Sequence, residues 1–284
     1  MKRVITAEKL LAIAEMERQW LSRFAARFRA AWREYGFQGI FIYGPQGSGK
    51  STLALKLAYH ALGSWQRALR ALFFDPGELS VMLRAALRRM GVPEDILDGV
   101  REGSEEALAR LQAALAGAPP EAREPLLIWD DAGVWASKYF FFRDKDYVMR
   151  VAFTVELARG FSAGLIVTAT APSRVLTALR EQEWLFFRLV RGATFHVQSG
   201  GRFRGKVKVG LIKPYALSVL PDGRVRAYKY TKYVIPFVVK LPDDVYNQYK
   251  AMRDTYFLRA PSLAHRPASG KHAKEQEGED EEES

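Results

Sequence analysis

Gly44-Pro45-Gln46-Gly47-Ser48-Gly49-Lys50-Ser51 decides the fold, because it fits the phosphate-binding pattern G-x-x-x-x-G-K-[ST] at every position. The apolar, β-prone run 39–43 precedes this stretch, and residues 52–62, which have helical spacing and end at Gly63, follow it. A strand, a glycine-rich loop and a helix in this order point backbone N–H groups at a phosphate. The sequence therefore predicts a nucleotide site.

Each part of this loop has a predicted role in binding ATP and Mg²⁺. Lys50 supplies a positive charge to the β- and γ-phosphates, and the Ser51 hydroxyl is a ligand for Mg²⁺. The residues predicted to contact the nucleotide are Gly44, Pro45, Gln46, Gly47, Ser48, Gly49, Lys50, Ser51 and Thr52.

Composition restricts the other kinds of chemistry. The 284 residues contain no cysteine, which excludes disulfides and thiolate metal sites, and the four histidines have no metal-ligand spacing. Mg²⁺ carried by the nucleotide is the only metal implied. No apolar run approaches the ~18 residues of a membrane-spanning helix, and no signal peptide is recognisable, so we expect a cytoplasmic protein. A single asparagine together with the absence of cysteine is typical of a protein from a hot environment.

The chain up to residue 198 alternates apolar strands with helices. A helical pattern covers residues 6–35, as one long helix or two shorter ones, and ends before Gly36. Helical stretches extend to Ala116, a further helix is expected over residues 147–159, and a helical segment separates the last two strands. Beyond the strand before the loop, strands are expected at 70–75, 126–131, 164–170 and 193–198. This order predicts an α/β fold with a parallel sheet of about five strands between helices.

Four regions follow from these patterns. We expect an N-terminal helical segment (1–36), a nucleotide-binding core (37–198), a basic β-rich module (199–260) and a disordered acidic tail (261–284). Within the module, residues 215–220 and 224–230 are predicted to form a hairpin, 233–241 a strand and 245–257 a short helix.

The positive charge is concentrated in the predicted module. The whole chain has a net charge of +11, residues 199–260 have thirteen basic and four acidic side chains, and the tail has a net charge of −4. A concentrated basic region predicts a polyanion partner, most simply DNA, although a solubilising surface or a charge-protected edge strand would have the same composition. In a regular strand the first four candidates for DNA contact would project from one face. The candidates are Arg202, Arg204, Lys206, Lys208, Arg224 and Arg226.

Two carboxylates end the strand at 126–131. Asp130 lies where a P-loop protein holds Mg²⁺ through water, and the adjacent Asp131 is a candidate base for the water that attacks the γ-phosphate. Together with the loop and the polar strand end at Thr168 and Thr170, these residues resemble the P-loop ATPases of the AAA+ and related additional-strand (ASCE) class. The resemblance covers about residues 36–198.

The resemblance implies further roles and an oligomer. Thr168 or Thr170 would sense the γ-phosphate, and Arg188 or Arg191 would reach the nucleotide of a neighbouring subunit in a homo-oligomer. Two features depart from the family: the family generally has glutamate where Asp131 stands, and a basic β-rich segment replaces the usual helical lid.

The leading functional prediction is an ATPase that acts on DNA, in replication initiation, helicase loading or DNA remodelling, from a virus or plasmid of a thermophile. A DNA-packaging, phage-assembly or secretion motor and a non-hydrolysing nucleotide switch are alternatives, and a small-molecule kinase fits less well. The aromatic and basic segment 137–145 would either stack bases of single-stranded DNA or lie in the core. The N-terminal helix and the acidic tail are candidate surfaces for a protein partner.

Overall fold

The computed structural model describes residues 3–34, 36–101, 104–117, 119, 122–133, 158–171, 185–219, 225–229 and 234–264. The chain separates into two units, Met1–Leu241 and Pro242–Ser284. The predicted helix at 147–159 lies mostly outside the described residues, as does the segment 137–145.

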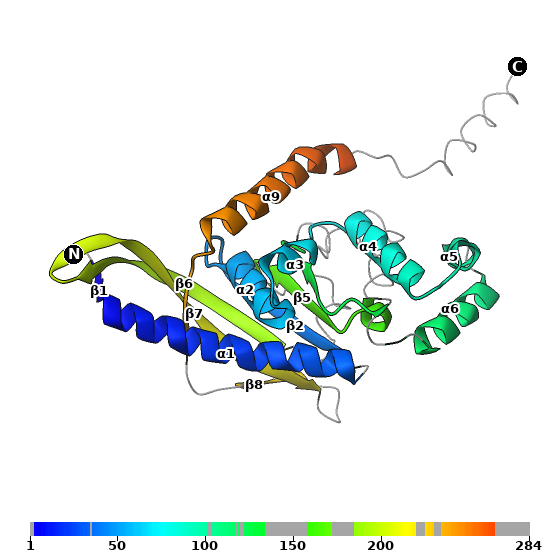
Figure 1. Ribbon diagram of the computed structural model, residues 1–284, viewed down its shortest axis with the longest axis horizontal. Coiled ribbons are helices and arrows are strands. Elements are labelled where there is room, and N and C mark those ends of the chain that lie inside the picture. The colour runs from blue at the N-terminus through cyan, green and yellow to red at the C-terminus, as the bar shows by residue number, and fades with distance from the viewer. Residues whose placement is uncertain are drawn as a thin grey trace, which may run out of the picture. The chain divides into compact units, whose positions relative to one another are not determined.

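Five parallel strands form the centre of the first unit (Figure 1). Their spatial order is β3 (Leu72–Phe73), β4 (Leu127–Trp129), β5 (Gly164–Ala169), β2 (Gln38–Tyr43) and β6 (Leu185–Ser199). Every residue of β3, β4 and β5 is buried, as expected for parallel strands covered on both faces. The predicted α/β fold with a parallel sheet of about five strands is therefore confirmed.

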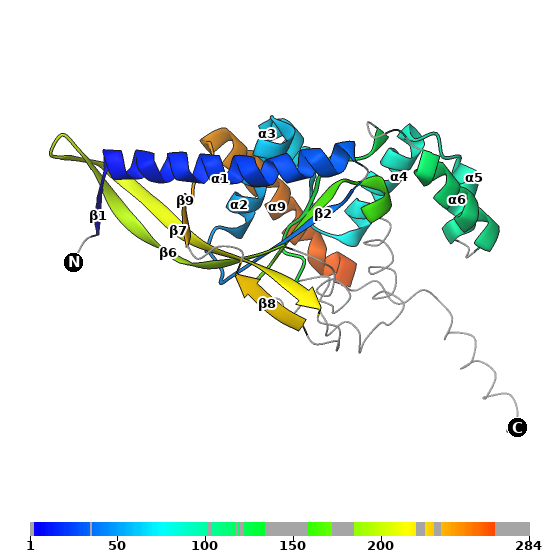
Figure 2. The same ribbon diagram turned by 90° about the horizontal axis from the view of Figure 1, so that it is seen from below.

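Helix α1 (Ala7–Arg33) lies along one face of this sheet (Figure 2). Its N-cap Thr6 accepts a hydrogen bond from the Lys9 N–H. The helical structure predicted over residues 6–35 is confirmed, and it is one continuous helix and not two. Neighbouring residues of β6 show the two faces. Phe187 contacts Trp20 and Phe24 of α1, whereas Phe186 contacts Phe41 on the opposite face.

Five shorter helices connect the strands up to β4, and they agree with the predicted helical stretches up to Ala116. Helix α2 begins at the end of the glycine-rich loop. The helices are α2 (Lys50–Leu62), α3 (Trp65–Arg70), α4 (Pro76–Arg89), α5 (Glu94–Arg101) and α6 (Glu105–Gly117). Buried residues of α4 and α5 form a small separate cluster with Leu111 of α6.

Strand β6 continues far beyond the central sheet as one arm of a long antiparallel hairpin (Figures 1 and 2). Its partner is β7 (Arg202–Val219), and the turn is made by Gly200 and Gly201, both with positive φ. Two consecutive glycines with positive φ match the turn geometry that hairpins prefer. The prediction of a last strand at 193–198 was wrong about its start, because β6 begins at Leu185 and pairs with β2 over residues 185–188.

The same sheet includes the rest of the predicted basic module. Strands β8 (Val225–Lys229) and β9 (Ile235–Val238) both pair with β7, and β1 (Val4–Thr6) pairs with β6, which makes nine strands in the described residues. The predicted boundary at 198/199 therefore falls next to the turn of one hairpin. Continuous strand pairing joins the two sides of that boundary.

The second unit contains α9 (Asp243–Ala264), which is longer than the predicted helix at 245–257. The predicted boundary at 260/261 falls inside this helix. Residues 265–284, most of the predicted acidic tail, lie outside the described residues. Among the described helices, none is both long and apolar enough to cross a membrane.

Candidate nucleotide site

The glycine-rich loop joins the end of β2 to the start of α2, in the context that the sequence predicts. Gly47 and Gly49 have φ of +72° and +96°, values that side chains with a Cβ rarely adopt. Gly49 is the N-cap of α2, so the positive end of the helix dipole lies at the loop. The backbone is thus shaped to accept an anion.

Two polar side chains of the loop, Lys50 and Ser48, are buried. The Lys50 ammonium donates to the carbonyls of Gly44 at 3.1 Å and Pro45 at 3.4 Å. Ser48 Oγ is fully buried and has no hydrogen-bond partner among the described residues. A buried hydroxyl without a partner costs free energy unless a ligand or water completes it, which favours an anion in this loop.

Three elements meet at Asp130. Ser51 Oγ, in the first turn of α2, donates to Asp130 Oδ1 at 3.0 Å, and Thr168 Oγ1, on β5, donates to the same oxygen at 2.6 Å. Asp130 and Thr168 are 2% and 0% exposed. Two hydroxyl donors thus fix the position of this buried carboxyl group. The predicted Mg²⁺ residues Ser51 and Asp130 are therefore adjacent, and Thr168 belongs to the same cluster.

Asp131 has the one positive φ, 55°, among the described residues other than glycine. Its backbone N–H donates to Thr168 Oγ1 at 2.9 Å, so the threonine holds both carboxylate residues. A non-glycine residue in the left-handed region costs on the order of 1 kcal/mol and persists where its surroundings fix it. Such backbone strain is frequent at functional sites.

The arms of the hairpin and the strand β9 enclose the loop. A Cβ at Gly44 would lie 2.6 Å from the Leu189 carbonyl oxygen of β6, and a Cβ at Gly49 would lie 2.8 Å from Val239, just after β9. Lys208 Nζ of β7 donates to the Gly47 carbonyl. Gly44 and Gly49 are thus needed for close approach, and Gly47 and Gly49 for the conformation of the loop. The sequence had placed Lys208 among the DNA contacts and gave no sign of this position.

The other predicted catalytic residues are dispersed. Thr170 is exposed, one residue beyond the end of β5. Arg188 and Arg191 are exposed on β6, where the sequence had predicted the segment before a strand. Arg188 is opposite Tyr43, the residue before the loop, so it lies at the same edge of the sheet as the nucleotide site.

The predicted single face of four basic residues is wrong, because β7 contains a bulge. Gly205 is opposite Val197 and Phe203 is opposite Gln198, which leaves Arg204 without a cross-strand partner. Lys206 and Lys208 share a face, and Phe203 lies on it too, in contact with His196. Arg202 is on the face of Val207, which is buried next to α1.

Two further residues, Arg224 and Arg226, were predicted to contact DNA. Arg224 lies outside the described residues, and Arg226 lies on β8 opposite Ser218.

The described residues contain no group of three or more metal-ligating side chains. The Ser51 hydroxyl next to the Asp130 carboxylate fits a Mg²⁺ ion that also has phosphate and water ligands.

A glycine-rich loop between a buried strand and a helix, faced by a carboxylate from another strand of the same parallel sheet, defines a P-loop NTPase fold. No family model matches the sequence. The chain is 27% identical over 229 residues to the uncharacterized protein B-251 of Sulfolobus spindle-shape virus 1, an alignment that covers 78% of this chain and 75% of the viral protein.

Two solved structures from archaea align with this chain. A KaiC-like protein from Pyrococcus horikoshii aligns with 69% of this chain and 92% of its own, at 18% identity and a TM-score of 0.27. The flagellar accessory protein FlaH from Methanocaldococcus jannaschii aligns with 68% of this chain and 91% of its own, at 15% identity and a TM-score of 0.29.

Proposed function

We propose that this protein is an ATPase of the additional-strand class. The observation that carries the proposal is the cluster at Asp130, where hydroxyls from α2 and β5 donate to one buried carboxylate beside the phosphate loop. Strand order supports the class, because β5 is inserted between the loop strand β2 and the carboxylate strand β4. This insertion brings Thr168 next to both Asp130 and Asp131.

Each residue of this site has a separate role in ATP hydrolysis. Lys50, held by two loop carbonyls, can turn its ammonium to the phosphate oxygens. Mg²⁺, held by Ser51 directly and by Asp130 through water, would neutralise phosphate charge. The Asp131 carboxylate accepts a proton from the attacking water as the bond between the γ-phosphorus and the leaving diphosphate oxygen breaks. Thr168 fixes the backbone of Asp131 for this role.

The test of this proposal is turnover of ATP and GTP by the full chain, measured as phosphate release. Lys50→Ala controls for contaminating activity. Saturable ATP binding without turnover would contradict hydrolysis and favour the non-hydrolysing switch. Absence of binding to either nucleotide would overturn the nucleotide site itself.

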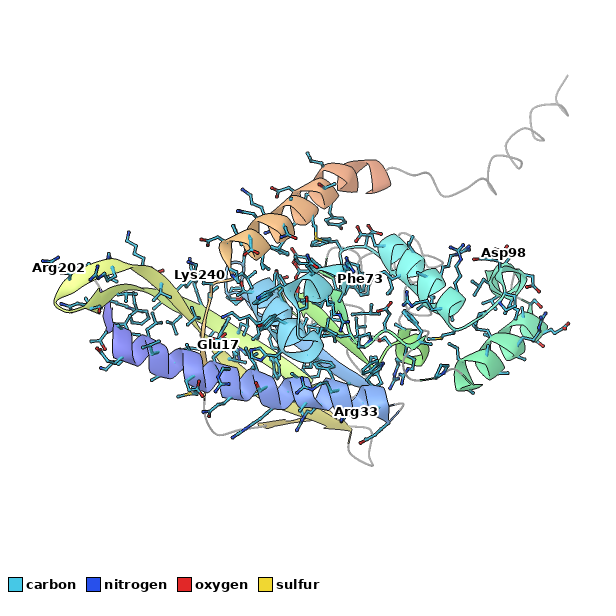
Figure 3. The ribbon with its side chains drawn as sticks, viewed as in Figure 1. Glu17, Arg33, Phe73, Asp98, Arg202 and Lys240 are labelled. Carbon is cyan, nitrogen blue, oxygen red and sulfur yellow. The ribbon has the colours of Figure 1, made fainter. Side chains whose placement is uncertain are left out.

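DNA is proposed as the second ligand, at the tip of the hairpin, in keeping with a role in replication initiation, helicase loading or DNA remodelling. Arg202 (Figure 3) and Arg204 are exposed there, and Phe203 between them in the sequence is 62% exposed, so the tip offers cations and an aromatic ring. This combination suits a nucleic acid, whose phosphates meet the cations and whose bases stack on the ring. Phosphate release measured with single- and double-stranded DNA tests the coupling, and an unchanged rate would contradict it.

A homo-oligomer is proposed from the two arginines on β6. Arg188 and Arg191 are exposed near the nucleotide edge, where a neighbouring copy could receive them. Mixing Arg188→Ala or Arg191→Ala subunits with Lys50→Ala subunits should restore turnover if an arginine acts on the nucleotide of its neighbour. Failure of both mixtures would contradict an arginine acting between subunits.

A further inference from the structure

We infer that Lys208 is a positioning residue of the nucleotide site, separate from the basic residues at the hairpin tip. This inference rests on the proposed nucleotide site. Its starting point is one contact: Lys208 Nζ donates to the carbonyl of Gly47, the fourth residue of the phosphate loop. The lysine comes from β7, more than 150 positions along the chain from the loop.

Strand register explains why Lys208 reaches the loop. Val207 and Val209 alternate with it and are buried on the side of α1, in one cluster with Ile5. Lys208 therefore projects from the opposite face, which it shares with Gly210 and, across the β7–β9 pairing, with Phe237. A Cβ at Gly49 would lie 3.1 Å from the Phe237 ring, so this face is the one that packs against the loop.

The contact holds one side of a turn in the loop, and Lys50 contacts the Pro45 carbonyl on its other side. The Ser48 N–H donates to the Pro45 carbonyl at 3.1 Å, closing a turn over residues 45–48. Lys208 holds the carbonyl of the peptide group that also contains this N–H. Polarising a peptide from one side strengthens the hydrogen bond on its other side. Lys208 therefore stabilises the turn that shapes the loop.

Charge adds to this effect. Lys50 contacts the carbonyls at the start of the loop and Lys208 contacts the carbonyl at its middle, so two ammonium groups hold the loop. A lysine ammonium has three donors, and the phosphates of a nucleotide bring several negative charges to the loop. An ammonium beside the loop favours their binding.

The experiment compares Lys208→Met with Lys213→Met in the full chain. Lys213 is an exposed lysine on the same strand without an assigned role, so its substitution is a matched control for loss of one positive charge. The readouts are the dissociation constant of a fluorescent ATP analogue with Mg²⁺ and the melting temperature without nucleotide. We expect Lys208→Met to bind the analogue about tenfold more weakly, Lys213→Met to bind as wild type, and both melting temperatures to stay unchanged.

A conservative variant distinguishes a positioning role of Lys208 from a general effect on packing. Lys208→Arg keeps a cationic donor and should restore affinity to within about threefold of wild type. If Lys208→Met does not fold, Lys208→Gln takes its place. We expect Lys208→Gln to bind the ATP analogue more weakly than wild type, because it lacks the positive charge. Wild-type affinity in the neutral variant would overturn the inference and leave the nucleotide site intact. A wild-type chain that does not bind the analogue would overturn the proposed function first.

Discussion

The nucleotide edge of the sheet and the tip of the β6–β7 hairpin hold their polar side chains in opposite ways. At the nucleotide edge, Asp130 and Thr168 are almost completely buried and hydrogen-bonded to each other. At the tip, Arg202 and Arg204 are exposed, and neither guanidinium group has a hydrogen bond or ion pair within the described part of the chain. Groups fixed in advance suit a reaction that needs exact positions, whereas free cations suit a partner recognised mainly by its charge.

The largest effect is expected at the nucleotide edge. Lys50→Ala removes the buried ammonium of the loop, and ATP turnover should fall below detection, by at least about 100-fold. Phosphate release by the purified full chain checks this. DNA binding through the tip should survive in the same variant, because Lys50 is not part of the hairpin. Loss of both functions would break the separation of the two regions.

The next effect distinguishes binding from chemistry within the nucleotide edge. Asp131→Asn keeps a side chain that tolerates positive φ but removes the carboxylate base, so turnover should fall between about 10² and 10⁴-fold. Nucleotide affinity, measured by fluorescence titration, should stay close to wild type. Hydrolysis at the wild-type rate would show that Asp131 is not the base.

A third effect concerns the support behind the loop. Glu17 of α1 (Figure 3) is 4% exposed; it accepts from Lys56 Nζ at 2.5 Å and from the Val238 N–H at 2.8 Å, which ties α1 to α2 and β9. Glu17→Ala removes the carboxylate from the Lys56 ammonium, which keeps only the Val238 carbonyl as acceptor, and leaves the Val238 N–H without its acceptor, so the free energy of unfolding should fall by about 3 kcal/mol.

Chemical denaturation of the full chain measures this loss. Glu17→Gln, which still offers an acceptor to the Val238 N–H, serves as the control and should be less destabilised. Equal losses in the two variants would assign the effect to charge alone.

The smallest effect is expected at the tip. Each phosphate contact contributes about 0.9 to the slope of log affinity against log salt concentration, so Arg202→Ala with Arg204→Ala should reduce the slope by about 1.8. DNA binding measured over a range of salt concentrations gives this value. Lys213→Ala is the control on the same strand and should leave the slope unchanged. An unchanged slope in the double variant would remove DNA from the tip.

The nucleotide site was the more predictable of the two regions. Its loop is a continuous stretch whose residue types determine backbone conformation locally, and Asp130 follows a short apolar strand that is recognisable by itself. The hydrogen bonds from Ser51 and Thr168 to Asp130 could not be predicted from the sequence, because they depend on how α2, β4 and β5 are placed in three dimensions.

The hairpin was predicted less well, although one signal was present. Gly200 and Gly201 separate two alternating segments, a pattern typical of a hairpin turn. This pattern indicates that the strands on the two sides of the boundary predicted at 198/199 belong to one hairpin. The bulge at Arg204 has no such signal. It depends on how β7 pairs with β6, and a bulge there changes which basic residues share a face.

By itself, the sequence determined that this chain has a phosphate-binding loop, a carboxylate strand and a parallel sheet, because glycine spacing and apolar periodicity act over a few neighbouring residues. Only the tertiary structure decided that Lys208 lies at the loop and the arginines at the tip. Strand register sets these positions, and register depends on pairing between segments far apart in the chain. Basic residues of one alternating run therefore lie in two different regions, the hairpin tip and the phosphate loop.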